Sequence, residues 1–187
     1  MNIPNKLTLF RVILIPVFMC FYLLSYQWSL ISALIVFVVA CLTDQLDGHL
    51  ARKNNQITTF GKLMDPLADK LLVLSAFVCF LSKGVVFFSA PVVMIFLARE
   101  LIVTGIRMLA LNENRTIAAS MSGKIKTTLQ MVLIISVLVF GIAAKYLPSF
   151  VFVFDILTKI EVVAAALVTL YSGVEYVVKN KDIITFK

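Results

Sequence analysis

Acidic side chains are scarce in this chain, which has 10 Asp and Glu among 187 residues against 17 Lys and Arg. No acid precedes Asp44, and none lies between Asp69 and Glu100. There is one histidine, and the three cysteines lack paired metal-ligand spacing, which argues against a disulfide framework. A zinc site near the acids would need several His or Cys ligands, and the stretch from Asp44 to Asp69 holds a single histidine, His49, and no cysteine. The four aspartates from Asp44 to Asp69 therefore stand out.

Apolar residues dominate the rest of the chain. Hydrophobic residues make up 61% of it, and the mean hydropathy is +1.01. This composition is outside the range of a soluble domain and predicts one membrane domain over residues 1–187. The net charge of +7 comes from cations near helix ends, without interleaved aromatics. It therefore indicates a lipid bilayer as partner and no nucleic acid.

The apolar runs predict an all-α, polytopic fold with six transmembrane helices. The expected helices cover residues 7–24, 30–50, 65–82, 85–111, 124–144 and, after an interfacial piece, the later part of 150–178. Most cations and all four aspartates fall near one side. The positive-inside rule makes that side cytoplasmic, together with both termini, so we expect a multi-pass protein of the cytoplasmic membrane with its active site facing the cytoplasm.

The first acids share one face of the second predicted helix. Asp44, Asp47, Gly48, Ala51 and Arg52 follow the spacing i, i+3, i+4, i+7, i+8. That face carries two carboxylates, two small residues and a terminal cation.

The third predicted helix repeats the pattern. Gly61, Asp65 and Asp69 are spaced i, i+4, i+8, and Asp65 is expected to cap a helix whose first residue is Pro66. A carboxylate at membrane depth costs about 3 kcal/mol, so these acids need cations. All-oxygen ligation favours Mg²⁺ or Mn²⁺ first and Ca²⁺ next. The alternative is interfacial salt bridges with nearby lysines or Arg52.

The spacing D-x-x-D-G-x-x-A-R followed by G-x-x-x-D-x-x-x-D resembles the signature of the CDP-alcohol phosphatidyltransferase family. The matching positions are Asp44, Asp47, Gly48, Ala51, Arg52, Gly61, Asp65 and Asp69. The stretches NIPNKLTLFRVILIP, MDPLADKLL, ARELIVTGIR and GKIKT are similar to one bacterial branch, which makes phosphatidylglycerophosphate.

This resemblance implies an enzyme that transfers the phosphatidyl group of CDP-diacylglycerol to an alcohol and releases CMP. It implies two Mg²⁺ or Mn²⁺ ions per site. Asp44, Asp47 and Asp65 are the expected metal ligands. Asp69 is the expected catalytic base for the acceptor hydroxyl, and it is also a candidate fourth ligand.

The small residues of the signature suit a nucleotide lying on the helix face. Gly48 and Ala51 leave room for it, although close helix packing explains them too, and Arg52 is placed to bind phosphate. Asn5 and Thr8 resemble nucleotide-side residues of the family, and an interfacial cap explains them equally well. The residues expected to bind CDP-diacylglycerol are Gly48, Ala51, Arg52, Gly61, Asn5 and Thr8.

Four cations around the fourth and fifth helices are candidates for the acceptor phosphate: Arg99, Arg107, Lys124 and Lys126. They favour the dianion glycerol 3-phosphate over a zwitterion. Arg99 has an alternative interpretation as the ion-pair partner of Glu100 or of an aspartate. The positive-inside rule is the alternative for the other three.

Other functions remain open at this point. A sister enzyme would use inositol phosphate or a phospholipid alcohol as acceptor. A membrane ion transporter is less favoured, because the acids gather at one interface and paired broken helices are missing. The family resemblance also allows a homodimer.

Overall fold

A computed structural model describes residues 3–53, 59–112, 117 and 120–184. All regular structure in these ranges is helical, which confirms the predicted all-α class for them. The helices are α1 (Ile3–Leu23), α2 (Ser29–Lys53), α3 (Thr59–Ser82), α4 (Ala90–Asn112), α5 (Met121–Tyr146), the short 3₁₀ helix η1 (Pro148–Phe150), α6 (Val151–Lys179) and α7 (Lys181–Ile184).

Two predicted helix starts are too late by four residues or more. α1 begins at Ile3 rather than at residue 7, and α3 begins at Thr59 rather than with Asp65 as its cap. Pro66 therefore lies inside α3. A proline removes one backbone donor and does not force a helix to begin there, especially in a membrane protein, where neighbouring groups satisfy the freed carbonyl.

α4 begins later than predicted, at Ala90 rather than at residue 85. Gly84 and Phe87 both have positive φ, 66° and 65°, which breaks the helical path after Ser82. Pro91 is the second helical residue, a position where its missing N–H costs little.

The expected interfacial piece before the last helix is also wrong. α6 is one continuous helix of 29 residues, about 43 Å long. Asp155, Lys159 and Glu161 lie within it, because charged side chains do not interrupt helical hydrogen bonding. η1 makes the turn between α5 and α6.

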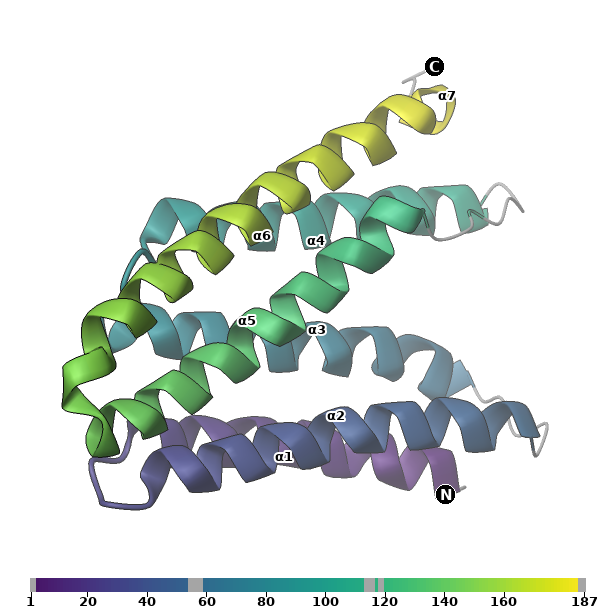
Figure 1. The fold of residues 1–187 in the computed structure, drawn as a ribbon. Helices are drawn as coiled ribbons and strands as arrows, with labels where there is room; N and C mark the ends of the chain where they lie inside the picture. The colour runs from purple at the N-terminus through teal and green to yellow at the C-terminus, as the bar shows by residue number, and fades with distance from the viewer. Residues whose placement is uncertain (1–2, 54–58, 113–116, 118–119, 185–187) are drawn as a thin grey trace.

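The helices form two connected groups (Figure 1). α1 and α2 lie side by side with α3 against them, and α4 packs on α6 at the opposite side of the molecule. α5 crosses obliquely between these groups and contacts both α2 and α6.

Aromatic rings hold the first four helices together. Phe18 of α1 lies 5.7 Å from Phe37 of α2, and Phe77 of α3 lies 4.6 Å from Phe96 of α4, measured between ring centroids. All four rings are fully buried. Such pairs contribute about 0.5–1.5 kcal/mol each beyond the area they bury.

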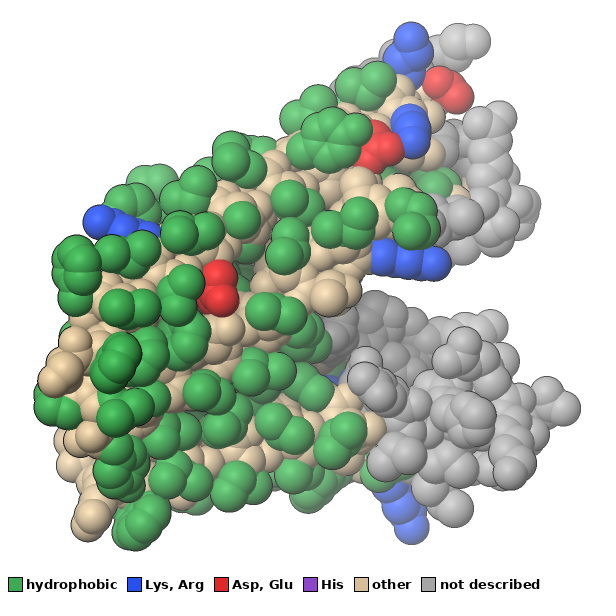
Figure 2. All heavy atoms as spheres, viewed as in Figure 1, with side chains coloured by type: hydrophobic (Ala, Val, Ile, Leu, Met, Phe, Trp, Pro, Cys, Tyr) green, Lys and Arg blue, Asp and Glu red, His purple; other side chains and the backbone are tan. Residues whose placement is uncertain are grey.

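The surface is largely apolar on the face drawn in Figure 2, and many of the charged side chains seen there lie near the end where α6 terminates. Two described segments have the length and hydropathy of a membrane span, Lys6–Leu23 and Met121–Tyr146. Ser29–Thr43 and Lys70–Ser82 are shorter apolar stretches. The described helices are consistent with a membrane protein, and two segments in the described part of the chain meet the length and hydropathy of a span.

The chain brings five helix termini to one end of the molecule. The ends of α2, α4 and α6 and the beginnings of α3 and α5 all lie on the side of the N-terminus in Figure 1. Segments far apart in the sequence therefore end on the same side of the molecule.

Candidate functional site

The aspartates of the signature lie on two adjoining helices. Asp44 and Asp47 are in the last turns of α2, and Asp65 and Asp69 are in the first half of α3. α2 and α3 contact each other. Gly48, Ala51 and Arg52 share α2, and Gly61 shares α3. The side chains of all these residues lie outside what the structure describes, so their metal-binding, catalytic and CDP-diacylglycerol-binding roles stay predictions.

The donor set of these two helices suits the predicted metal. Four carboxylates offer oxygen ligands only, and oxygen is the ligand that Mg²⁺ and Mn²⁺ prefer. Among the residues whose side chains are described, no group of three or more His, Cys, Asp or Glu is placed to hold a metal. The signature aspartates stay the predicted ligands of such an ion.

α1 carries the two predicted nucleotide-side residues. Asn5 lies in its first turn, and its side chain is outside the described part. Thr8 is buried, with 1% exposure, and Arg11 one turn later is fully buried. An arginine inside an apolar helix needs polar surroundings, so this part of α1 faces the protein interior.

A cavity of about 390 Å³ opens between α3, α4 and α5. Its lining residues are Lys70, Arg99, Glu100, Arg107, Gly123, Lys124, Thr127 and Thr128. We call it the cation cavity. Three of the four predicted acceptor residues line it together, namely Arg99, Arg107 and Lys124. The fourth, Lys126, lines a smaller neighbouring cavity that shares Lys70, Glu100 and Thr127 with it.

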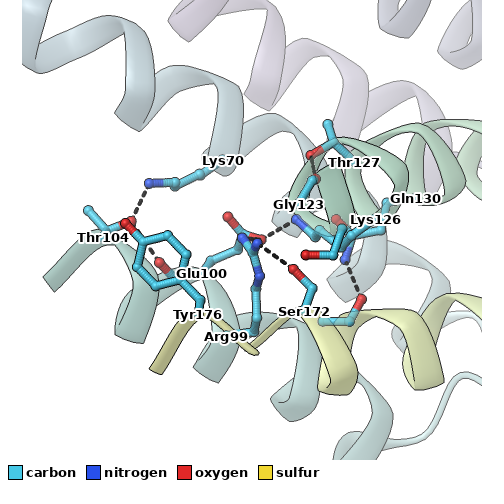
Figure 3. Close-up of polar contacts among 12 residues, drawn as sticks. Lys70, Arg99, Glu100, Thr104, Gly123, Lys126, Thr127, Gln130, Ser172 and Tyr176 are labelled. Atoms are coloured by element: carbon cyan, nitrogen blue, oxygen red, sulfur yellow. Dashed lines mark hydrogen bonds and ion pairs between the residues drawn. The ribbon is translucent and has the colours of Figure 1, made fainter. Parts of the chain in front are cut away.

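Glu100 is the centre of an ion triad (Figure 3). Its Oε1 accepts a hydrogen bond of 3.3 Å from Arg99 Nη1 and is ion-paired with Lys126 Nζ. The three side chains are between 5% and 12% exposed. The alternative interpretation of Arg99 as a partner of Glu100 is thus confirmed. Removing one member of such a buried set costs about 3–5 kcal/mol, because the remaining charge loses its partner.

Arg99 passes between α5 and α6 through a gap bounded by two glycines. A Cβ on Gly173 would lie 3.2 Å from Arg99 Cγ, and a Cβ on Gly123 would lie 3.2 Å from Arg99 Nη2. At its tip, Nη2 donates a hydrogen bond of 2.9 Å to Ser172 Oγ. The guanidinium is therefore held by α4, α5 and α6 together, and its position is fixed by close packing.

Arg107 and Lys124 are on the rim of the cation cavity. Arg107 Nε donates a hydrogen bond of 3.3 Å to Tyr176 Oη, and its guanidinium carbon lies 5.7 Å from the centre of the Tyr176 ring. Lys124 is exposed in the first turn of α5, a helix capped by the Ser120 side chain. The positive end of the α5 dipole adds to the charge of Lys124 and favours an anion here.

Sequence reasoning missed Lys70, Glu100 and Thr104 as site residues. Lys70 Nζ donates a hydrogen bond to Thr104 Oγ1, which in turn donates to the Glu100 carbonyl over 2.6 Å. Lys70 had counted only as an interfacial cation and an alternative partner of the aspartates. The position of Lys70 directly after Asp69 in the signature indicates a residue near the site. The hydrogen bond that links Lys70 to α4 cannot be predicted from local spacing, because Lys70 and Thr104 are 34 residues apart.

The cation cavity is suited to binding a phosphate. Of the residues whose side chains are described, four cations and one carboxylate line it, with a summed formal charge of +3. Arginine offers a planar set of donors, lysine a mobile point charge, and Thr127 and Thr128 add hydroxyl groups. A small dianion fits this environment better than a neutral alcohol or a zwitterion.

Comparisons with known proteins agree with the signature. The family model for CDP-alcohol phosphatidyltransferase matches residues 1–172. A Bacillus subtilis (strain 168) protein named CDP-diacylglycerol–glycerol-3-phosphate 3-phosphatidyltransferase is 37% identical over 191 aligned residues, which cover 96% of this chain and 95% of that protein. An Escherichia coli (strain K12) protein of the same name is 44% identical over 133 residues, covering 70% of this chain and 73% of that protein. This chain belongs to the CDP-alcohol phosphatidyltransferase family.

Proposed function

We propose that this chain transfers the phosphatidyl group of CDP-diacylglycerol to glycerol 3-phosphate and releases CMP. Two relatives that bear this activity in their names align with 70% or more of the chain. The observation that carries the choice of acceptor is the cation cavity. Lys70, Arg107 and Lys124 come from three different helices and converge there on one space, as recognition of a free phosphate group requires.

The signature aspartates form the metal site of this proposal. Asp44, Asp47 and Asp65 hold two Mg²⁺ or Mn²⁺ ions. Such ions, when bound, neutralise the pyrophosphate and stabilise the attacking and leaving oxygens of a displacement. The chain itself contributes the carboxylates and the two adjoining helices α2 and α3 that carry them.

Asp69 is the proposed general base. It removes the proton from the acceptor hydroxyl, so that the oxygen attacks the phosphorus next to the lipid and CMP leaves. Asp69 directly precedes Lys70 on α3, and Lys70 lines the cation cavity. Helix α3 thereby links the acceptor's phosphate, bound in that cavity, with the carboxylate that activates its hydroxyl.

The nucleotide half of CDP-diacylglycerol lies against α2 and α1 in this proposal. Gly48 and Ala51 leave space for it, and Arg52 binds a phosphate oxygen. The remaining proposed contacts are Gly61, Asn5 and Thr8. In this proposal α1 and α2 bind the nucleotide part of CDP-diacylglycerol, and α4 and α5 bind the acceptor. Helix α3 contributes residues to both substrate sites.

We further propose that α1 to α6 all span the cytoplasmic membrane, with both termini and the active site on the cytoplasmic side. The gathering of helix ends at the N-terminal side of Figure 1 supports this, as does the excess of Lys and Arg there. Water-soluble glycerol 3-phosphate and CMP would then enter and leave from the cytoplasm.

An acceptor screen tests the proposal. The full-length protein, purified in detergent with CDP-diacylglycerol and Mg²⁺, should release CMP with glycerol 3-phosphate at least about a hundredfold faster than with glycerol or serine, because only the first offers a phosphate to the cavity. Inositol phosphate and phosphatidylglycerol are the controls for a sister activity. Faster CMP release with either of these would assign the chain a different acceptor.

A further inference from the structure

Glu100 stands out because, among the residues whose side chains are described, it is the one carboxylate lining a cavity otherwise lined by cations and small or hydroxyl-bearing residues. It also lines the adjacent smaller cavity, opposite Lys126. A carboxylate placed here opposes the binding of an anion, so its presence needs a physical reason. The triad with Arg99 and Lys126 provides one.

We propose that Glu100 is a positioning residue that supplies the counter-charge of the cation cavity. It restricts the acceptor phosphate to a binding position formed by Lys70, Arg107, Lys124 and one edge of Arg99. This rests on the function proposed above. Lys126 is then a partner of Glu100 and acts on the acceptor only through it.

The geometry of Arg99 supports this role. Its Nη1 is directed to Glu100 and its Nη2 to Ser172, and the two flanking glycines leave little space for another position. Glu100 and Ser172 therefore orient the guanidinium from two sides. Without Glu100, the Nη1 edge of Arg99 would be available to the phosphate while the packing against the glycines stays.

The contacts of Lys126 support it as well. Lys126 is buried, with 4% exposure, whereas Lys124 two residues earlier is exposed on the cavity rim. Its ammonium is ion-paired with the same carboxylate oxygen that Arg99 contacts. One carboxylate thus engages two cations that would otherwise attract an anion.

The consequence is control over where the acceptor binds. If the counter-charge were removed, Arg99 and Lys126 would both attract the phosphate and draw it deeper than Lys70 and Arg107 alone hold it. Binding would become tighter while the hydroxyl moved away from the reacting phosphorus. A displacement of about 1 Å costs about a hundredfold in rate when attack geometry matters.

The first test compares Glu100→Gln with the wild-type protein, both full-length and in detergent. The KM for glycerol 3-phosphate and the inhibition constant of inorganic phosphate should both fall about fivefold, because one negative charge has left the cavity. The kcat should fall at least about tenfold, and the KM for CDP-diacylglycerol should stay unchanged. KM and inhibition constants do not depend on how much of the protein folds. A lower kcat with an unchanged KM and an unchanged inhibition constant would therefore indicate a purely structural defect and overturn the proposal.

Two matched variants sharpen the test. Glu100→Asp keeps the charge and should restore the wild-type inhibition constant of phosphate. Glu175→Gln removes a carboxylate from α6 that is ion-paired with Lys179 over 2.5 Å and does not line the cavity. It should leave the phosphate inhibition constant and the KM for glycerol 3-phosphate unchanged. A fivefold fall in Glu175→Gln as well would remove the specific role of Glu100.

A double-mutant cycle separates direct from indirect action of Lys126. Lys126→Gln should raise the inhibition constant of phosphate, because it leaves Glu100 with Arg99 as its one cation in the triad and so exposes more of its negative charge to the cavity. Combining it with Glu100→Gln should return the constant to near the wild-type value. If Lys126 binds phosphate directly, its removal weakens binding equally in both backgrounds, and the proposal is wrong.

The phosphate dependence of thermal unfolding gives a readout that does not depend on turnover. Phosphate raises the Tm of a protein that binds it only when folded, and the Glu100→Gln variant should reach a given rise at about one fifth of the wild-type phosphate concentration. Absence of CMP release by the wild-type protein with glycerol 3-phosphate would refute the proposed function. An unchanged phosphate titration in Glu100→Gln would refute the role of Glu100 whether or not the function holds.

Discussion

The two halves of this site differ in how they are built. The aspartates come from one continuous stretch, at the end of α2 and the start of α3. The cation cavity is assembled from α3, α4 and α5, with α6 holding Arg99 and Arg107 in place. The aspartates are close together in the sequence, whereas the residues of the cation cavity are distant in the sequence and come together only in the tertiary structure. In the proposed function, the metal ligands can therefore be found from spacing within one stretch, whereas the proposed acceptor site depends on how α3, α4, α5 and α6 pack.

Replacing the metal ligands should have the largest effect. Asp44→Asn, Asp47→Asn and Asp65→Asn should each lower turnover at least about a thousandfold, because an amide does not balance divalent charge. The assay is CMP release with Mg²⁺ or Mn²⁺, and Asp182→Asn on α7 is the control expected to keep its activity. Near-normal rates in EDTA would contradict the metal site.

The catalytic base should come next. Asp69→Asn should keep CDP-diacylglycerol binding while losing about a hundredfold to ten-thousandfold in rate, because proton removal fails but the metal ligands remain. A variant that loses binding as well would make Asp69 a fourth metal ligand. The reaction at a chiral phosphorus should proceed with inversion, as a single displacement requires. Retention, or a phosphatidyl group isolated on an aspartate, would make that residue a nucleophile.

The cavity cations should affect one substrate more than the other. Lys70→Ala, Arg107→Ala and Lys124→Ala should each raise the KM for glycerol 3-phosphate about tenfold, since a charged hydrogen bond to phosphate is lost. The KM for CDP-diacylglycerol should change much less. Lys179→Ala, whose side chain is largely exposed on α6, is the control. Equal changes in both KM values would show that these cations serve the pyrophosphate or the fold.

The glycines around Arg99 should give the smallest effect. Gly173→Ala places a methyl group 3.2 Å from Arg99 Cγ, and the resulting shift should raise the KM for glycerol 3-phosphate about threefold. Gly105→Ala is a matched control, because an added Cβ there meets no atom within 4 Å. It should leave KM unchanged and stabilise α4 by up to about 1 kcal/mol. Identical KM values in both variants would show that packing around Arg99 does not set the cavity.

Local patterns predicted the helices better than their ends. The all-α class follows from long apolar runs, and α2 and α5 begin within three residues of their predicted starts. The errors come from single residues given too much weight. Pro66 predicts a helix start at a position that lies inside α3, which begins at Thr59. The charges near Asp155 predict an interruption where α6 is continuous. Neither feature prevents helical hydrogen bonding.

For the site, composition and spacing identified three of the four cations of the cavity. They did not identify Lys70, and they grouped Lys126 with the others although its ammonium is ion-paired with Glu100. Position in the sequence shows that a charge lies in an apolar run. Which neighbour balances that charge depends on helix packing.

The amino-acid sequence alone established the family signature, the four carboxylates and the membrane-like composition, because each depends on residue identity and helical periodicity within a short stretch. The arrangement of helices established the rest. Lys70, Arg99, Lys124 and Ser172 belong to four helices and come together only when α3, α4, α5 and α6 pack. Contacts between such distant residues arise from the packing of whole helix faces, which no local spacing encodes.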